Sequence, residues 1–310
     1  MSFNPPVANA EDALAASITR ASSRQAYYIV RYLVDRDLIA DAYRAYAYFR
    51  WVDDELDERR MERSERMAFV ARESTLINRC YREDWPQPAS NEEAMLVDLI
   101  RADRRPQSGL QLYLRHMMAV MEFDAERRGR LISEDELSLY TRHLATAVTE
   151  ALHHFIGCGC PSPKGDIRYL AASGAHVVHM LRDTREDVLN GYFNVPREYL
   201  EAQHLDPCDV GSDPYRKWIR SRVQLAQTFF HAGRDYLGQV VNPRCRLAGF
   251  AYIARFEVIL EAIVRDGFQL RADYADCHAL TAAARIMASS LWLALSPRRL
   301  TTAPRVLQAR

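Results

Sequence analysis

The amino-acid sequence predicts an all-α protein that folds as a single domain around an internal cavity. Apolar residues recur at helical spacing in nearly every long segment, and no run of alternating apolar and polar residues predicts a strand. The chain has 310 residues, 48% of them hydrophobic, which is enough to enclose a large core. No linker, charge run or low-complexity segment divides it. We therefore expect one domain over residues 1–310, with a short N-terminus (about 1–9) and a C-terminal tail (about 298–310).

The ends of the expected helices follow from capping and turn signals. Ser133 with Glu136 has the capping-box pattern of a helix start, and Gly191 has the position of a helix end. Pro196 and Pro243 lie near helix starts, where the missing N–H of proline would be unpaired in any case. The predicted helices cover about residues 10–21, 24–34, 36–58, 63–82, 90–103, 109–128, 134–157, 166–190, 197–203, 214–240, 244–268 and 275–296.

The charge balance argues against nucleic acid as the main partner. Lys plus Arg and Asp plus Glu each number 41, so no charge excess attracts a polyanion. The six cysteines are scattered through a chain too large to need a disulfide framework, and Met1 is followed by no basic and apolar signal sequence. The apolar stretch at residues 286–295 is too short to span a bilayer. We expect a cytoplasmic protein, soluble or peripheral to the membrane.

Two aspartate-rich motifs lie on predicted helices, at residues 53–57 (Asp-Asp-Glu-Leu-Asp) and 183–187 (Asp-Thr-Arg-Glu-Asp). Because an α-helix has 3.6 residues per turn, residues three or four apart share one face. The first motif continues a stripe of Tyr43, Tyr46, Arg50, Asp53 and Asp57. The second continues a stripe of His176, His179, Arg182 or Asp183, and Asp187. Two such helices facing each other would present four carboxylates to a shared space.

Carboxylates at this spacing repel each other unless a cation lies between them. Mg²⁺ prefers oxygen ligands and is usually held by one or two carboxylates together with substrate phosphates. A diphosphate bound there would leave more readily, because the metal neutralises its developing charge. Arg50 and Arg182 precede the motifs and can bind phosphate oxygens in pairs. The alternative is an exposed, salt-bridged face, but Asp53 follows an aromatic and apolar run that predicts burial, where unpaired carboxylates are costly.

The residues around both motifs resemble the squalene/phytoene synthase family. Residues 45–57 (Ala-Tyr-Ala-Tyr-Phe-Arg-Trp-Val-Asp-Asp-Glu-Leu-Asp) are similar to the family's Tyr-Ala-x-x-Arg-x-x-Asp-Asp-x-x-Asp. Residues 180–187 (Met-Leu-Arg-Asp-Thr-Arg-Glu-Asp), followed by residues 196–198 (Pro-Arg-Glu), are similar to its Leu-Arg-Asp-x-x-Glu-Asp and downstream Pro-Arg-Glu. The separation of the motifs also fits, so the resemblance extends over almost the whole chain.

The resemblance implies an isoprenoid synthase fold with a central cavity and a Mg²⁺-dependent prenyltransferase activity. It implies catalytic and metal-binding roles for Asp53, Asp57, Asp183 and Asp187, with Mn²⁺ as an alternative ion. His179, which departs from the family pattern, is an additional candidate ligand, because a neutral imidazole can bind a metal. The implied reaction joins two farnesyl or geranylgeranyl diphosphates head to head. One allylic diphosphate ionises, and the double bond of the second molecule attacks the cation. The resulting cyclopropyl diphosphate rearranges to a squalene- or phytoene-type product.

The resemblance also implies a set of substrate-binding residues. Residues 254–260 look like the late helix that closes the family's active site, with Phe256 where the family often has tyrosine. Arg24, preceded by Ser22 and Ser23, lies where the family places a substrate-phosphate segment. Aromatic rings can stabilise a cation through their π faces. The implied substrate-binding residues are Arg50, Arg182, His176, His179, Tyr46, Tyr252, Arg24 and Phe256.

The chain departs from the family pattern in its histidines. His176 and His179 stand where the family usually has a Gln and an Asn, and His153 and His154 stand where small residues are expected. Up to four histidines are therefore expected near the cavity mouth or lining. Together with two nearby cysteines they suggest zinc, but the spacing matches no standard ligand pattern. An imidazole can donate a hydrogen bond to phosphate or accept a proton from a cationic intermediate.

These observations leave three hypotheses. The leading one is head-to-head condensation of two prenyl diphosphates. The second, which the histidines favour, is transfer of one prenyl group to a non-isoprenoid acceptor such as an aromatic compound, or its cyclisation. The third is a non-catalytic lipid-binding or assembly factor, against which the intact motifs argue. Three further questions stay open: a need for NADPH, since no dinucleotide fingerprint is present; monomer or homodimer; and transient membrane contact through residues 275–296.

Overall fold

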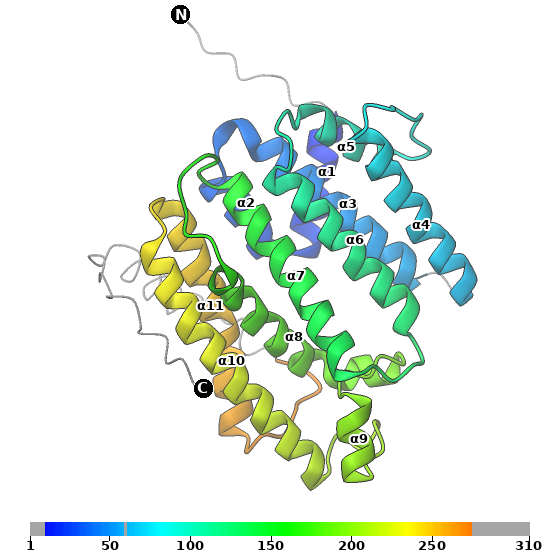
Figure 1. The fold of residues 1–310 in the computed structure, drawn as a ribbon, viewed down its shortest axis with the longest axis vertical. Coiled ribbons are helices and arrows are strands. Elements are labelled where there is room, and N and C mark those ends of the chain that lie inside the picture. Colours follow the sequence, from blue (N-terminus) through cyan, green and yellow to red (C-terminus); the bar gives the residue numbers. More distant parts are fainter. Residues whose placement is uncertain (1–9, 59–60, 275–310) are drawn as a thin grey trace, which may run out of the picture.

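The computed structural model describes residues 10–58 and 61–274 as a bundle of helices (Figure 1). Within these ranges no strand forms, which confirms the predicted all-α fold. The α-helices are α1 (Ala10–Ser22), α2 (Arg24–Leu33), α3 (Ile39–Glu58), α4 (Arg63–Cys80), α5 (Asn91–Ala102), α6 (Gly109–Arg127), α7 (Glu134–Phe155), α8 (Leu170–Leu189), α9 (Arg197–Gln203), α10 (Asp213–Gln239) and α11 (Pro243–Arg265). Two single-turn 3₁₀-helices, η1 (Arg36–Leu38) and η2 (Asp166–Tyr169), precede α3 and α8.

The helix ends agree closely with the local signals in the sequence. Ser133 and Glu136 form the expected capping box at the start of α7, each side chain accepting the backbone N–H of the other. The start of α3 differs from the prediction, because the carboxylate of Asp35 binds the N–H of Gly157 and does not cap the helix. Outside the described residues lie the predicted helix 275–296 and the terminal segments 1–9 and 298–310.

Three long helices run side by side through the middle of the bundle, α6, α7 and α8 (Figure 1). The helices α6 and α7 form an antiparallel pair, and α8 packs between α7 and α10. On one side of this layer, α3 packs against α1, α5 and α6; on the other, α11 packs against α8 and α2. The two helices that carry the aspartate motifs, α3 and α8, are thus connected through pairs of packed helices, α6 with α7 and α2 with α11.

Glycine permits the close approach of α8 and α10. A Cβ atom added at Gly233 of α10 would lie 2.7 Å from the Cβ of Ala171 and 2.9 Å from its backbone. Backbone atoms cannot move aside as the end of a flexible side chain can. We therefore predict that Gly233→Ala lowers the free energy of unfolding by about 1–3 kcal/mol through overpacking.

Urea denaturation measures this effect, and Gly238→Ala is the matched control on the same helix. A Cβ at Gly238 meets nothing within 4 Å, so this substitution should be neutral or stabilising, by up to about 1 kcal/mol. Equal effects of the two substitutions would show that helix propensity, and not the contact with Ala171, dominates.

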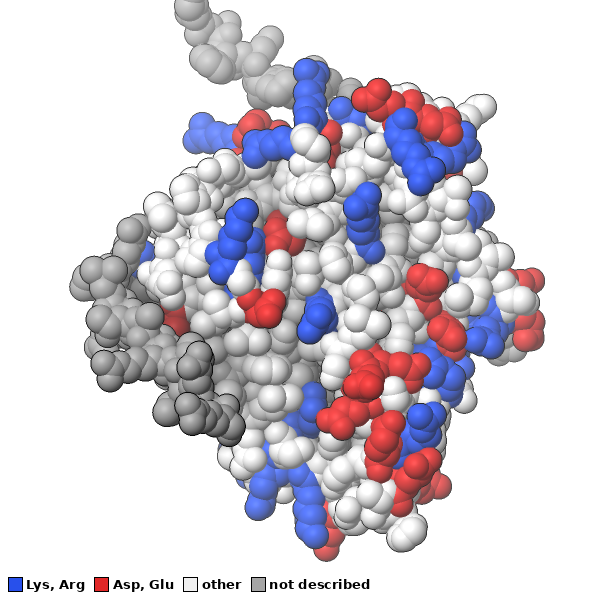
Figure 2. All heavy atoms as spheres, in the orientation of Figure 1, with Lys and Arg blue, Asp and Glu red and all other residues white. Residues whose placement is uncertain are grey.

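Acidic side chains gather over the beginning of α7 on the face shown in Figure 2. The first turn of this helix contains Glu134, Asp135 and Glu136. Carboxylates at a helix N-terminus interact favourably with the helix dipole, so this cluster has a structural explanation. Among the residues that the structure describes, no helix combines the length and apolar character required to cross a bilayer.

Candidate active site

The carboxylates of the first motif lie on the last two turns of α3. Val52 on the opposite side of the helix is fully buried in the core, whereas the side chain of Asp53 is 41% exposed. This division is what an amphipathic helix produces. Arg50, one turn earlier, donates from Nη1 to Oδ2 of Asp53 at 3.1 Å and from Nη2 to Asp54. The arginine is therefore paired with the motif it precedes.

Asp183 of the second motif is held by two cationic or hydrogen-bonding neighbours on α8. Arg182 donates from Nε to Oδ1 at 2.5 Å and from Nη2 to Oδ2 at 2.7 Å, and Nε2 of His179 lies 2.9 Å from Oδ2. Desolvation opposes ionisation of Asp183, but these hydrogen bonds outweigh it and hold the pKa of the carboxyl below its ordinary value. Asp183 is therefore ionised at neutral pH.

Asp187, one turn later, has a different environment. Its Oδ2 accepts a 2.6 Å hydrogen bond from Nδ2 of Asn194, in the loop that follows α8. Desolvation, reinforced by the charge of Asp183 and opposed by this hydrogen bond, raises the pKa of Asp187 to about 7. Asp187 and Asp183 therefore differ in ionisation although they share one face of the helix.

The first motif shows the same crowding of negative charge. Desolvation and then the charge of Asp57 raise the pKa of Asp53 to about 7, and the pKa of Asp57 is raised by desolvation and by Asp124. A divalent cation among these oxygens would remove the repulsion, so this donor set fits Mg²⁺. Within the described part of the chain, no three His, Cys, Asp or Glu side chains are grouped closely enough to hold a metal without other ligands.

Asp124 on α6 brings the two motifs into one electrostatic environment. Its charge raises the pKa of Asp53 and Asp57 on α3 and also of Asp187 on α8. Asp124 therefore lies within electrostatic range of both motifs. Sequence reasoning missed this residue, because a single aspartate on α6 belongs to no acidic repeat.

Arg255 of α11 is within electrostatic range of residues on both motif helices. Its pKa is lowered by desolvation and by Arg182, and it also interacts with Tyr46 of α3 and Asp183 of α8. The side chain of Tyr46 hydrogen-bonds Ser23, the N-cap of α2. Arg24, the first residue of α2, is exposed beside this contact. Residues 22–24, for which the resemblance implies a substrate-phosphate segment, thus lie next to the helix of the first motif.

Aromatic side chains of α11 continue from the second motif toward the interior. The ring of Phe256 lies 6.3 Å from that of His179 and 5.2 Å from that of Tyr252, between ring centroids. Tyr252 lines a pocket between α7, α8, α10 and α11. The predicted residues His179, Phe256 and Tyr252 therefore form a continuous path that begins at Asp183.

His176 has a different position from His179. It is 4% exposed, its ring packs edge-on against Tyr140 at 4.9 Å, and neither ring nitrogen has a hydrogen-bond partner among the described residues. Burial, together with nearby positive charge, lowers its pKa well below the ordinary value, so the ring is neutral. Of the two histidines before the second motif, only His179 contacts a motif carboxylate.

His153 and His154 lie at the other end of the α7–α8 pair. These two helices are antiparallel, so the C-terminal turn of α7 lies beside the start of α8, far from Asp183. Nε2 of His153 is 2.7 Å from the hydroxyl of Tyr236, and its Nδ1 is 3.6 Å from Sγ of Cys245. His153 lines the same pocket as Tyr252. The four histidines therefore do not form one group.

An all-α bundle with aspartate motifs on two of its helices, α3 and α8, is typical of the helical isoprenoid synthase-type fold. The sequence profile of the squalene/phytoene synthases matches residues 19–281, and the chain belongs to that family. Membership makes it a prenyltransferase-type enzyme of isoprenoid metabolism. A comparison with curated proteins found no match.

Solved structures support the same fold. The crystal structure of squalene synthase HpnC from Alicyclobacillus acidocaldarius superposes with a TM-score of 0.65 at 22% sequence identity, covering 84% of this chain and 95% of that chain. The structure of TcSQS with the ligand BPH1237 superposes with a TM-score of 0.69 at 14% identity, covering 91% of this chain and 87% of that chain.

Proposed function

We propose that this enzyme condenses two prenyl diphosphates head to head, with farnesyl or geranylgeranyl diphosphate as substrate and Mg²⁺ as cofactor. The observation that carries the proposal is that the charge of Asp124 acts on both motifs, on Asp53 and Asp57 of α3 and on Asp187 of α8, while Arg50 and Arg182 are paired with motif carboxylates. Carboxylates and arginines so combined suit a polyanion bound through a divalent cation.

The residues have separate roles in the proposed reaction. Asp53, Asp57, Asp183 and Asp187 would hold Mg²⁺, which when bound neutralises the charge on the departing diphosphate. Arg50 and Arg182 would exchange their carboxylate partners for phosphate oxygens. The first diphosphate leaves with the electron pair of its C–O bond. The double bond of the second substrate forms the new C–C bond, and loss of a proton closes the cyclopropane ring.

The aromatic path along α11 suits the hydrocarbon part of the substrate. Tyr252 and Phe256 present apolar ring surface next to the proposed ionisation site, and π faces stabilise a passing cation. His179 also borders this path, and its contact with Asp183 favours a second candidate function. In that function the cation is captured by a different acceptor or by an internal double bond, and an imidazole accepts the proton.

Product analysis separates these functions. Purified protein is incubated with Mg²⁺ and detergent-solubilised farnesyl or geranylgeranyl diphosphate, with and without NADPH, and the products are identified by mass spectrometry. A product that contains both prenyl chains is expected. A product with one chain supports the second candidate, and no consumption of either substrate contradicts both and points to a non-catalytic relative.

A further inference from the structure

Arg127, at the end of α6, is a buried cation next to the candidate site. It is 6% exposed, and the rings of Tyr140 and Tyr192 lie 5.1 and 4.9 Å from its guanidinium carbon. Nε donates to Oδ1 of Asp124 at 2.8 Å, and Nη1 donates to Oδ1 of Asn194 at 2.8 Å. A buried charge is tolerated only when it is paired and hydrogen-bonded, and here both partners belong to the surroundings of the motifs.

The second of these bonds determines how Asn194 is oriented. A guanidinium group has only donors, so the amide oxygen of Asn194 must face Arg127. The amide nitrogen then points the other way, and it donates to Oδ2 of Asp187 at 2.6 Å. Through Asn194, Arg127 thus determines which oxygen of Asp187 accepts a hydrogen bond.

The loop that carries Asn194 is fixed on both sides of this residue. The N–H of Gly129 donates to the carbonyl of Gly191 at 2.8 Å, and the N–H of Arg197 donates to the carbonyl of Ile132 at 2.7 Å. Both bonds join the loop to the α6–α7 connection that follows Arg127. The distance between Arg127 and Asn194 is therefore set by the backbone.

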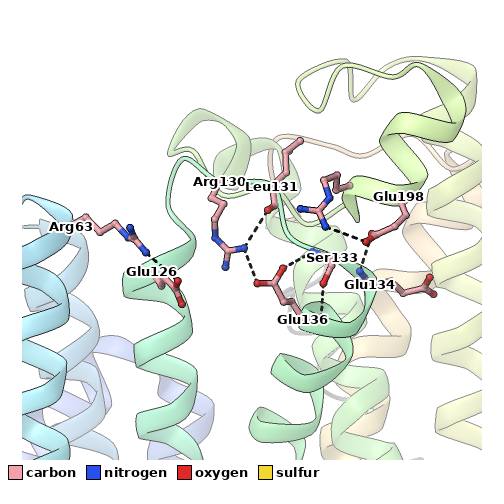
Figure 3. Close-up of polar contacts among 9 residues, drawn as sticks. Arg63, Glu126, Arg130, Leu131, Ser133, Glu134, Glu136 and Glu198 are labelled. Carbon is pink, nitrogen blue, oxygen red and sulfur yellow. Dashed lines mark hydrogen bonds and ion pairs between the residues drawn. The ribbon is translucent and has the colours of Figure 1, made fainter.

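The α6–α7 connection is itself held by side chains, as Figure 3 shows. Nη1 of Arg130 donates to Glu136 at 2.7 Å, and the N–H of Glu134 donates to Glu198 of α9 at 3.0 Å. These contacts join the start of α7 to the turn before it and to α9. The connection that follows Arg127 is thus held by side chains as well as by backbone bonds.

We infer that Arg127 is a positioning residue for the carboxylates of both motifs. Through Asn194 it orients Asp187, and it also binds Asp124, whose charge acts on the first motif. It thus aligns these carboxylates for a metal-bound diphosphate. The inference rests on the proposed function. One guanidinium can do this because its donors diverge in a plane, whereas a lysine ammonium cannot span both partners. Residues that orient metal ligands affect metal affinity by about 10- to 100-fold.

The test measures binding of Mg²⁺ with inorganic diphosphate by isothermal titration calorimetry. The variants are Arg127→Lys, Asn194→Ser and the double variant, each checked by circular dichroism and thermal unfolding. The matched control is Arg66→Lys. Arg66 is 7% exposed and also donates to α6, from Nε to the carbonyl of Ala125 at 3.2 Å, but it contacts no motif residue in the described structure.

We expect Arg127→Lys and Asn194→Ser each to weaken binding about tenfold or more. The double variant should bind no more weakly than the weaker of the two single variants, because both substitutions break the same chain of contacts. Arg66→Lys should lower the melting temperature without changing affinity. Wild-type affinity in Arg127→Lys, or losses that multiply fully in the double variant, overturns the inference. If Arg127→Lys does not fold, the affinity of Asn194→Ser for Mg²⁺ and diphosphate tests the inference alone. Failure of the wild type to bind Mg²⁺ and diphosphate instead contradicts the proposed function.

Discussion

Replacing Asp53 or Asp183 with asparagine should reduce kcat by about a hundred- to a thousandfold. Each substitution keeps the shape of the side chain but removes the negative charge that would hold the cation, and charge stabilisation at a leaving group contributes this order of rate acceleration. The two residues stand on different helices, α3 and α8. Similar losses at both would show that turnover requires both motifs.

Turnover of the prenyl diphosphate at saturating Mg²⁺ is the measurement, and Asp98→Asn is the control. The side chain of Asp98 is 44% exposed, close to the 41% of Asp53, and it forms an ordinary i,i+3 ion pair with Arg101 on α5. This control should keep full activity. If Asp53→Asn and Asp183→Asn turn over substrate at wild-type rates, the motifs are structural and the proposed site is wrong.

The contribution of Asp53 and Asp187 to the stability of the metal-free protein should fall as the pH rises from 5 to 8. Asp53 and Asp187 have a pKa of about 7 in the folded protein, above the ordinary value of about 3.9. The folded state therefore binds protons more tightly than the unfolded state, so their contribution is present at low pH and is lost as the pH passes 7. The lowered pKa of Asp183 affects the stability only at acidic pH, below this range.

Mg²⁺ with diphosphate should reverse this trend, because the cation takes the place of the protons. At pH 6 each carboxyl with a pKa of about 7 must lose a proton on binding, which weakens apparent affinity about tenfold per group relative to pH 8. At a hundredfold excess over Kd, ligand raises the free energy of unfolding by about 2.7 kcal/mol.

Thermal unfolding with chelator, and with Mg²⁺ plus diphosphate, measures this dependence at pH 6 and pH 8. In the metal-free state, the stability of the wild type relative to the double variant Asp53→Asn, Asp187→Asn should fall from pH 6 to pH 8, since only the wild type has these two titrating groups. Equal stabilisation by ligand at the two pH values would contradict the linkage between protonation and metal binding.

The sequence predicted the helices well because their signals are local. The capping box at Ser133, the helix end at Gly191 and the proline at position 243 each act through neighbouring backbone groups, and the structure confirms all three. The stripe that contains Asp53 and Asp57 also depends only on helical periodicity. Where α3 began differently, the cause was a distant contact, the bond from Gly157 to Asp35.

The surroundings of the motifs could not be predicted in the same way. Asp124 and Arg127 are far along the chain from both motifs, and neither they nor Asn194, which follows the second motif, belong to a repeated pattern. Their roles arise because α6 packs against both α3 and α7 and because the loop after α8 returns to the α6–α7 connection. The histidines illustrate the converse: four were expected near one cavity, but the antiparallel arrangement of α7 and α8 separates His153 from His179.

The sequence by itself thus determined the all-α fold, the helix limits and the two carboxylate stripes, because periodicity and capping are properties of neighbouring residues. The tertiary structure alone decided that desolvation raises the pKa of Asp187 and Asp53 to about 7, whereas Asp183 is held ionised by Arg182 and His179 of its own helix. Desolvation and charge act through space, so they depend on which helices pack together and not on which residues are adjacent in the chain.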